Sequence, residues 1–327
     1  MEQMLRDSRV LVSGGAGFIG SNLVESLLLS GNYVVCLDNF STGKRENLKT
    51  FADNPNFKLI EGDIRNYNDC LKAVEKVDIV FHQAALGSVP RSIQDPVSTT
   101  DVNIGGFVKI LFASKEAGVK RFIYAASSST YGDHTDLPKV EDKIGSPLSP
   151  YAITKYVDEL FATNFAQTYG IDVIGLRYFN VFGRRQDPDG AYAAVIPKFV
   201  KMLMLHEVPR INGDGTISRD FTYIDNVLQA NHLAAIVQKK EALNQVYNVA
   251  HGERTSLNQL FYIIRELAGK FDKDILAIEP VYVPARAGDI PHSQASIEKA
   301  KKLLGYSPEL NVAEGLEESV NWFWSNL

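Results

Sequence analysis

The chain has 327 residues, of which 45% are hydrophobic and 22% charged, so we expect a soluble globular protein with either one large α/β domain or two modest domains. Lys and Arg number 34 against 39 Asp and Glu, and the net charge of −5 excludes the broadly basic surface of a general nucleic-acid binder. Cys36 and Cys70 are too few for a disulfide framework and lack metal-ligand spacing, so we predict a reducing compartment and no metal site. The sequence shows no signal peptide and no apolar run of about 20 residues, which predicts a cytoplasmic protein without membrane insertion.

Short β-branched apolar runs alternate with helical patterns from Arg9 to about Tyr178, as is typical of successive βαβ units. Strands are predicted at Val10–Ser13, Tyr33–Leu37, Phe57–Glu61, Ile79–His82, Phe122–Ala126 and Val173–Arg177. The expected fold is therefore α/β, with a Rossmann-type doubly wound parallel sheet whose strands are covered on both faces by helices.

The alternation ends after Asn180, where Gly and Pro interrupt the chain repeatedly. Helical patterns continue at 192–205, 225–239, 256–269, 296–303 and 313–325, separated by short apolar segments such as Gln245–Val249. We predict a first domain over residues 1–180 and a smaller C-terminal mixed α/β domain over 181–327, from which some chain returns to the first.

A glycine-rich loop lies between the first strand and the helix after it, with Gly14, Gly17 and Gly20 at intervals of three. Glycines in this setting permit a sharp turn and let backbone amides approach a pyrophosphate at the helix N-terminus. Asp38 ends the second strand, 18 residues beyond Gly20, where a carboxylate suits a ribose diol and favours NAD over NADP. Lys44 and Arg45 lie close to Asp38 in the sequence, and their positive charges weaken the preference for NAD over NADP unless they are simply a solvated pair.

Asp63 follows the third predicted strand, and Ile64 follows Asp63. A short acid at this place can receive the amino group of an adenine while the isoleucine packs on the ring. The alternative from the residues alone is that Asp63 caps a helix that begins near Tyr67.

Tyr151 and Lys155 fall one turn apart on a predicted helix, because Pro150 suits the first turn of that helix. A neighbouring ammonium and a cationic nicotinamide both stabilise a phenolate, so this tyrosine can act as a base. Hydroxyl residues from Ser127 to Thr130 follow the fifth strand, at the sheet edge where ligands bind in open α/β folds. Taken singly, each pattern also fits an amphipathic surface or a serine-rich turn.

Together these motifs resemble the extended short-chain dehydrogenase/reductase superfamily, and more closely its UDP-N-acetylhexosamine 4-epimerases. The likeness covers nearly the whole chain and is carried by GGAGFIG, Asp38-Asn39, Gly62-Asp63-Ile64, Ser127 to Gly132, Tyr151 and Lys155, Arg177 to Asn180, Arg219-Asp220-Phe221 and Arg286 to Asp289. It implies that the first domain binds NAD and the second a UDP-sugar.

The resemblance also implies residue roles. Catalysis falls to Ser127, Tyr151 and Lys155. The implied cofactor contacts are Gly14, Gly17, Phe18, Ile19, Gly20, Asp38, Asn39, Asp63, Ile64, Gln83, Ala84, Tyr151 and Lys155. The implied substrate contacts are Gly87, Ser88, Ser127, Ser129, Asn180, Arg219, Arg286, Asp289 and Ser293, with Arg219 and Arg286 supplying bidentate contacts to the diphosphate.

Related dehydratases and decarboxylases carry a carboxylate just before the Tyr-Gly pair, whereas this chain has Thr130 before Tyr131, which favours simple epimerisation. In the expected cycle Tyr151 takes the proton of the 4-hydroxyl while a hydride passes from C4 to NAD, giving a transient 4-keto sugar and bound NADH. The sugar then swings about its diphosphate link, and the hydride returns to the other face.

In the family's pattern, a bulky tyrosine at position 293 restricts the sugar pocket, whereas a small residue admits the N-acetyl group. This chain has Ser293, which is small and so fits an N-acetylated sugar. The expected activity is interconversion of UDP-N-acetylglucosamine and UDP-N-acetylgalactosamine. Two alternatives remain open, a 4-epimerase of the corresponding uronic acid and a non-catalytic nucleotide-sugar sensor. The helix from Tyr151 carries a wide apolar stripe that includes Ile153 and Leu160, and similar enzymes pair this helix with its copy, so a homodimer is expected.

Overall fold

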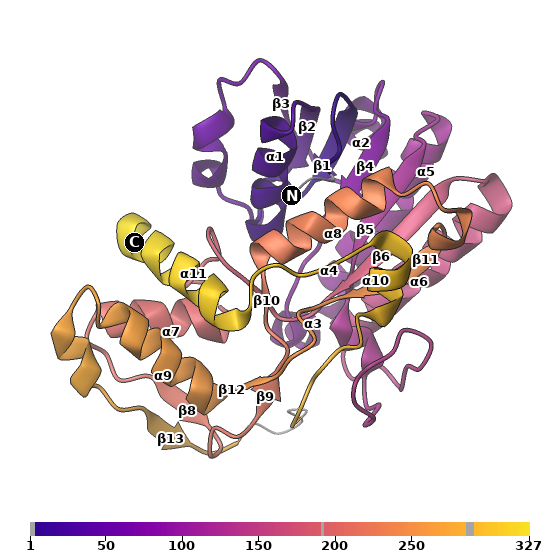
Figure 1. The fold of residues 1–327 in the computed structure, drawn as a ribbon. Helices are drawn as coiled ribbons and strands as arrows, with labels where there is room; N and C mark the ends of the chain where they lie inside the picture. Colours follow the sequence, from indigo (N-terminus) through magenta and orange to yellow (C-terminus); the bar gives the residue numbers. More distant parts are fainter. Residues whose placement is uncertain (1–3, 191–192, 286–290) are drawn as a thin grey trace.

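The computed structural model describes residues 4–190, 193–285 and 291–327. The main sheet contains β1 (Arg9–Ser13), β2 (Tyr33–Asp38), β3 (Phe57–Glu61), β4 (Ile79–His82), β5 (Arg121–Ser127), β6 (Asp172–Tyr178) and β11 (Gln245–Val249). These seven strands are parallel and lie in the order β11-β6-β5-β4-β1-β2-β3 (Figure 1). The six strands predicted from the sequence are confirmed, and each observed end lies within one residue of the predicted one.

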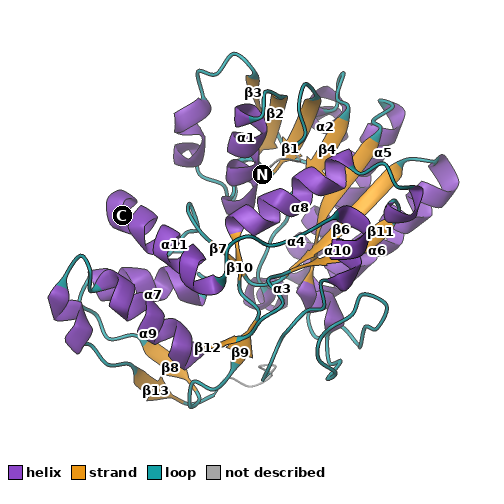
Figure 2. Ribbon diagram, in the orientation of Figure 1, coloured by secondary structure: helices purple, strands orange, loops and turns teal. Residues whose placement is uncertain are grey.

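Helices cover both faces of this sheet, which confirms the doubly wound α/β fold (Figure 2). One face packs against α1 (Phe18–Leu29) and α8 (Ile224–Ile236), and the other against α2 (Tyr67–Ala73), α5 (Phe107–Glu116) and α6 (Pro150–Tyr169). Successive strand residues point to opposite faces, so Val10 and Val12 join the first core while Leu11 joins the second.

The edge strand β3 departs from the prediction that every strand is buried on both faces. Lys58, Leu59 and Glu61 are exposed on it. The expectation was wrong here because β3 has a neighbour on one side only, and its charged residues Lys58 and Glu61 suit a half-covered edge.

The second half of the chain builds a smaller lobe, drawn below the sheet in Figure 2. Its helices are α7 (Val195–Met204), α9 (Leu257–Ala268) and α11 (Val312–Asn326). Three short strand pairs support it: β7 (Val181–Phe182) with β10 (Thr222–Tyr223), β8 (Arg210–Asn212) with β13 (Val281–Val283), and β9 (Ser218–Arg219) with β12 (Thr255–Ser256).

Shorter elements complete the fold. They are α3 (Val89–Gln94), α4 (Pro96–Thr100), the π-helix η2 (Asp101–Gly106), α10 (Glu298–Leu304), and the 3₁₀ turns η1 (Arg45–Phe51), η3 (Ser128–Tyr131), η4 (Lys240–Ala242) and η5 (Lys273–Ala277). Within the described ranges, no helix combines the length and apolar character that a bilayer crossing requires.

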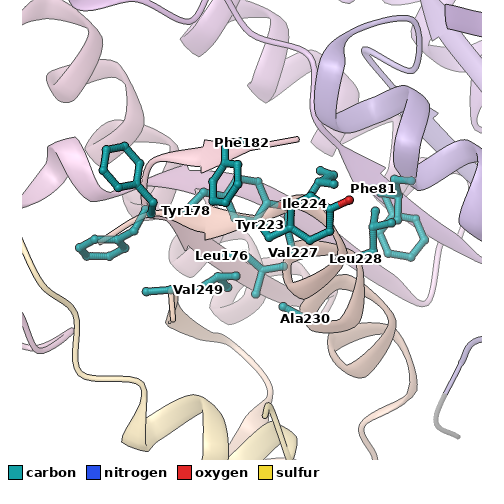
Figure 3. Packing of buried hydrophobic residues seen from close by; sticks show 14 of the residues in the cluster. Phe81, Leu176, Tyr178, Phe182, Tyr223, Ile224, Val227, Leu228, Ala230 and Val249 are labelled. Atoms are coloured by element: carbon teal, nitrogen blue, oxygen red, sulfur yellow. The ribbon is translucent and has the colours of Figure 1, made fainter. Parts of the chain in front are cut away.

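The second half also returns to the main sheet. β11 pairs with β6 and becomes the seventh strand, and α8 lies across β5 and β6. Figure 3 shows this junction, where Ile224 and Leu228 of α8 meet Phe81 of β4 and Leu176 of β6. The residues on both sides of position 180 therefore share one hydrophobic core.

Candidate active site

A cleft of about 520 Å³ opens at the carboxyl ends of β1, β2, β4 and β5, within the usual range of about 300 to 1,000 Å³ for cofactor sites. In a sheet of this kind, ligands bind at that edge. The cleft brings together every residue predicted to contact the cofactor, together with two predicted substrate contacts. These lining residues are Gly14, Gly17, Phe18, Ile19, Gly20, Asp38, Asn39, Asp63, Ile64, Gln83, Ala84, Gly87, Ser127, Tyr151 and Lys155.

The glycine loop between β1 and α1 is packed too closely for side chains. A Cβ on Gly20 would lie 2.0 Å from the carbonyl oxygen of Gly14, and a Cβ on Gly14 would lie 2.7 Å from the backbone of Ala84. Gly14 also has a φ of +70°, in the left-handed region that glycine adopts without strain. The loop therefore leaves room for a pyrophosphate beside the N-terminus of α1, which begins after Gly17.

Asp38 lies at the end of β2 and is buried beside this loop. Its Oδ2 accepts a hydrogen bond from the amide of Ala16 at 2.9 Å, and its Oδ1 accepts one from the amide of Phe40 at 2.8 Å. Burial raises the pKa of Asp38, and the two amides oppose that rise. Each carboxylate oxygen keeps a further lone pair, so the group can still accept the hydroxyls of a ribose.

Lys44 and Arg45, which the sequence left as a possible phosphate site, both have acidic partners. Lys44 Nζ lies 2.9 Å from Asp187, and Arg45 Nη2 lies 2.6 Å from Glu61. The Arg45 guanidinium also covers the ring of Phe40, at 4.0 Å from its centroid. With these charges paired, Asp38 dominates the ribose end of the cleft, which favours NAD over NADP.

Asp63 lines the cleft and does not begin a helix. Its carboxylate accepts hydrogen bonds from Asn39 at 2.8 Å and from Arg65 at 2.7 Å, and the Arg65 bonds chiefly lower the pKa of Asp63 to about 2. Helix α2 is capped instead by Asn66, whose side chain accepts from the amide of Asn68. The helix-cap alternative for Asp63 is therefore wrong.

Helix α6 begins as the sequence predicts. Ser149 is its N-cap and accepts a hydrogen bond from the amide of Ala152, and Pro150 occupies the first turn. The helix then carries Tyr151 and Lys155 one turn apart, and both line the cleft.

Lys155 is held from inside the protein. Its side chain is 2% exposed, and Nζ donates a hydrogen bond of 2.9 Å to the carbonyl of Ala125 on β5. A second partner is Asp158, one turn further along α6, with Oδ2 at 3.4 Å. The ammonium is thus tied to the strand end that also carries Ser127.

Ser127 is the last residue of β5 and accepts two hydrogen bonds at Oγ. One comes from the amide of Ser129 at 3.2 Å and the other from the hydroxyl of Ser129 at 2.9 Å. Because Oγ is already accepting, the proton of Ser127 is directed away from these donors. Ser129 is not among the cleft-lining residues, and its hydrogen bonds join it to Ser127, which is.

Asn103, in the π-helix η2, ties the loop after β4 to the helix that carries Tyr151. Its Oδ1 accepts from the amide of Leu86 at 2.8 Å, and its Nδ2 donates to the hydroxyl of Thr154 at 3.0 Å. The side chain is 1% exposed. The sequence analysis missed this residue, because its partners lie on separate elements.

The other predicted substrate residues that the structure describes lie outside the cleft lining. Asn180 is exposed and donates to the carbonyl of Asp220 at 3.0 Å, and the hydroxyl of Ser88 caps α3. Arg219 on β9 donates to the carbonyls of Ser218 and Pro291, and the amide of Ser293 pairs with Ser218. Arg286 and Asp289 fall outside the described residues.

One buried carboxylate joins the segments around Arg219 and Ser293. Asp220 is fully buried and accepts hydrogen bonds from the amides of His251, Gly252 and Ala295, at 3.1 to 3.2 Å. Three segments of the second half therefore converge on this side chain.

The cleft also has a wall that the sequence analysis did not predict. It includes Arg91, one turn beyond Gly87, and the segment after β7. The signal in the sequence was the group of small residues Gly190, Ala193 and Ala194, which can let the chain approach a ligand closely. The residues of this wall are Arg91, Val181, Gln186, Asp187, Gly190, Ala193 and Ala194.

Comparison with known proteins agrees with this geometry. A model of the NAD dependent epimerase/dehydratase family matches residues 10–250. A putative UDP-glucose 4-epimerase of Methanocaldococcus jannaschii is 37% identical over 319 residues, covering 97% of this chain and 99% of that protein.

Two solved structures extend the comparison. The UDP-N-acetylglucosamine 4-epimerase of Methanobrevibacter ruminantium, in complex with UDP-N-acetylmuramic acid, superposes with a TM-score of 0.92 at 39% identity, covering 99% of this chain and all of that one. The UDP-glucuronic acid 4-epimerase of Bacillus cereus, with UDP-glucuronic acid and NAD, gives 0.87 at 32% identity, covering 97% and 99%.

Proposed function

Because the chain belongs to the NAD dependent epimerase/dehydratase family, we propose that it interconverts UDP-N-acetylglucosamine and UDP-N-acetylgalactosamine. It is an NAD-dependent UDP-sugar 4-epimerase. The choice among UDP-sugars is the proposed part, since its relatives include enzymes named for UDP-glucose, UDP-glucuronic acid and UDP-N-acetylglucosamine.

The residues of the cleft fit NAD. The glycine loop would hold the pyrophosphate, Asp38 the adenosine ribose, and Asp63 with Ile64 the adenine. When bound, NAD supplies an acceptor for the hydride of the sugar C4 and a donor that returns it. No cofactor is consumed over a full cycle, so NAD serves as a resident group.

Three side chains would carry out the transfer of the proton of the sugar 4-hydroxyl. Ser127 would donate a hydrogen bond to the 4-hydroxyl of the sugar, consistent with an Oγ that already accepts two bonds. Tyr151 would take the hydroxyl proton and later return it, as a general base and then a general acid. Lys155, fixed by Ala125 and Asp158, stabilises the phenolate through its charge.

The substrate would be gripped at its diphosphate and left free at its sugar. Arg219 and Arg286 would clamp the phosphates with help from Asn180, and Asp289 would bind the uridine ribose. Inversion at C4 requires the keto sugar to present its second face, so the sugar end must be loosely held while the nucleotide is fixed.

The N-acetyl preference rests on open space at two small residues. A Cβ placed on Gly87, which lines the cleft, meets no described atom within 4 Å, and Ser293 has a small side chain beside the strand of Arg219. Ser88 belongs to the same proposed side of the pocket. The space at Gly87 is the observation that carries the proposal, because an acetamido group needs more volume than a hydroxyl.

The direct test is incubation of the purified protein with single UDP-sugars and no added NAD, followed by separation of the products. The panel holds UDP-N-acetylglucosamine, UDP-N-acetylglucosaminuronic acid, UDP-glucose and UDP-glucuronic acid. We expect the highest kcat/KM for UDP-N-acetylglucosamine. A higher value for UDP-N-acetylglucosaminuronic acid would replace the proposal with the uronic acid alternative, and a higher value for UDP-glucose or UDP-glucuronic acid would contradict the N-acetyl preference. No turnover of any sugar would favour the sensor.

Ser293→Tyr tests the pocket itself. A tyrosine there should abolish activity on N-acetylated sugars while UDP-glucose and UDP-galactose remain substrates. Ser293→Ala is the matched control, since it stays small and should keep both activities. An equal loss on both kinds of sugar would remove Ser293 from the specificity pocket.

We also propose that the protein is a homodimer paired through α6. Ile153 and Leu160 on this helix are 49% and 52% exposed, and Ile93 and Val97 on the neighbouring α3 and α4 are 63% and 78% exposed. Sedimentation equilibrium should give twice the mass of the chain, and Leu160→Glu should shift it to the monomer. A wild-type protein that stays monomeric at micromolar concentration would contradict this.

A further inference from the structure

The chemistry described so far uses the buried carboxylate behind the Lys155 ammonium only to hold that ammonium in place. Asp158 lies one turn beyond Lys155 on α6 and is fully buried. Its Oδ2 lies 3.4 Å from Lys155 Nζ, and its Oδ1 has no hydrogen-bond partner among the described residues. A buried carboxylate that is only partly bonded destabilises a fold, so structural need alone does not account for it.

The neighbouring acid on the same helix shows what a structural pair looks like. Glu159 is also buried, and both of its oxygens are bonded by the guanidinium of Arg177, at 2.7 and 2.8 Å. That pair is bidentate and complete. Asp158 instead makes a single long contact, and that contact is to Lys155, the residue whose charge acts on Tyr151.

We propose that Asp158 is a positioning residue for proton transfer: it holds the Lys155 ammonium and limits how strongly that charge stabilises the Tyr151 phenolate. An ammonium has three N–H donors. The carbonyl of Ala125 takes one and Asp158 takes another, so the third is left for the cleft that Lys155 lines. The proposal rests on the assignment of Tyr151 and Lys155 in the proposed function.

Two other titratable groups near Asp158 and Lys155, Tyr124 and His82, stay neutral over the working pH range. Burial raises the pKa of Tyr124 on β5 well above its usual value, so this phenol stays neutral. Burial and the charge of Lys155 lower the pKa of His82 on β4 to about 3, so this imidazole stays neutral too. Glu159 is bound to Arg177.

Asp158 itself titrates within reach of an assay. Burial raises its pKa to about 7, and Lys155 opposes that rise. Loss of the carboxylate charge therefore leaves the ammonium uncompensated, which stabilises the phenolate. The sign of the effect follows: without this carboxylate, Tyr151 becomes active as a base at lower pH.

The experiment compares pH profiles of kcat/KM for Asp158→Asn and wild type, both loaded with NAD. We expect the acid limb of Asp158→Asn to lie at lower pH than that of wild type, with lower kcat and an unchanged KM. The two profiles should converge below about pH 7, where wild-type Asp158 is itself protonated. Glu159→Gln is the matched control. It should lower the melting temperature and leave the acid limb in place, because its partner is Arg177.

An Asp158→Asn enzyme that is less stable but keeps the wild-type acid limb would overturn the proposal. Should that variant yield no folded protein, Asp158→Ser removes the same charge with less crowding and carries the same test. Tyr151→Phe separates the two hypotheses. If it retains wild-type turnover, the assignment of the base fails; if it is inactive and both Asp158 variants keep the wild-type limb, only the role of Asp158 fails.

Discussion

The cofactor cleft and the lobe that we propose as the substrate end are built in different ways. The cofactor cleft is formed by consecutive strand ends of one parallel sheet, and its shape is set by backbone contacts that leave no room for a Cβ. The substrate end is assembled from strand pairs of two or three residues, and three of its segments meet at Asp220. A rigid frame suits a resident dinucleotide, whereas short pairs joined by loops suit a lobe that must accept and release a nucleotide sugar.

Tyr151→Phe should have the largest effect and should separate chemistry from both binding regions. The loss of the phenolic proton carrier should lower kcat by about 10²- to 10⁴-fold. Bound NAD and the KM for the UDP-sugar should change little, because the ring stays in place. The measurement is steady-state kinetics together with the NAD content of the purified enzyme, and near-normal turnover would exclude Tyr151 as the base.

Gly20→Ala should damage the cofactor end selectively. Its Cβ would lie 2.0 Å from the carbonyl oxygen of Gly14, so the loop must shift. Overpacking of this kind costs about 1–3 kcal/mol, which corresponds to a roughly 5- to 150-fold weaker affinity for NAD. Isothermal titration with NAD measures the effect.

Gly31→Ala is a suitable control for that experiment, since a Cβ at Gly31 meets no described atom within 4 Å. Because Gly31 has a φ of +83°, an alanine there strains the backbone but crowds no described atom. The variant therefore reports the effect of backbone strain without crowding. Wild-type NAD affinity in Gly20→Ala would show that the loop tolerates the added carbon, and the contrast between the two ends would then fail.

Asp220→Asn should affect the substrate end alone. The amide can accept at one oxygen only, so at least one of the three backbone donors loses its partner, at about 1–3 kcal/mol. We expect the KM for the UDP-sugar to rise about tenfold, with NAD content unchanged. Asp225→Asn, which removes the charge of the nearer of the two carboxylates beside Arg184, is the control. Loss of NAD from Asp220→Asn would show that the two ends are not independent.

The smallest expected effect concerns the one ion pair described above that links the two ends. Lys44, beyond β2, contacts Asp187, in the segment after β7, and both side chains are partly exposed. Such pairs contribute about 0–1 kcal/mol, so Asp187→Asn should speed NAD dissociation by up to about fivefold. Arg45→Gln, which breaks only the pair with Glu61, should leave the rate unchanged, and high salt should reduce the difference between wild type and Asp187→Asn.

The sequence predicted the cofactor end well because its signals are local. Gly14, Gly17 and Gly20 lie close together in the sequence, and Tyr151 and Lys155 share a helix. The six predicted strands were visible as short runs rich in apolar residues. These features require no knowledge of contacts between distant segments. The order of the strands was not predicted and comes from the structure.

The parts that the sequence did not predict depend on distant contacts. Asp187 pairs with a lysine 143 positions earlier, and Asp220 bonds the amide of a residue 75 positions later. Gln245–Val249 looked like any short apolar segment until its pairing with β6 made it the seventh strand. Arg286 and Asp289 lie outside the described residues, and Asn180, Arg219 and Ser293 remain predictions for the substrate end.

The return of β11 and α8 to the main sheet has a consequence for unfolding. A chain cut at residue 180 would expose the edge of β6 and strip one face of β5 and β6, so the first half would lose part of its own interior. Because the two halves share this sheet, we expect heat or denaturant to melt both lobes in one cooperative transition. Evolution could therefore alter the loops of the sugar pocket freely, but could not exchange the whole lobe without rebuilding the sheet.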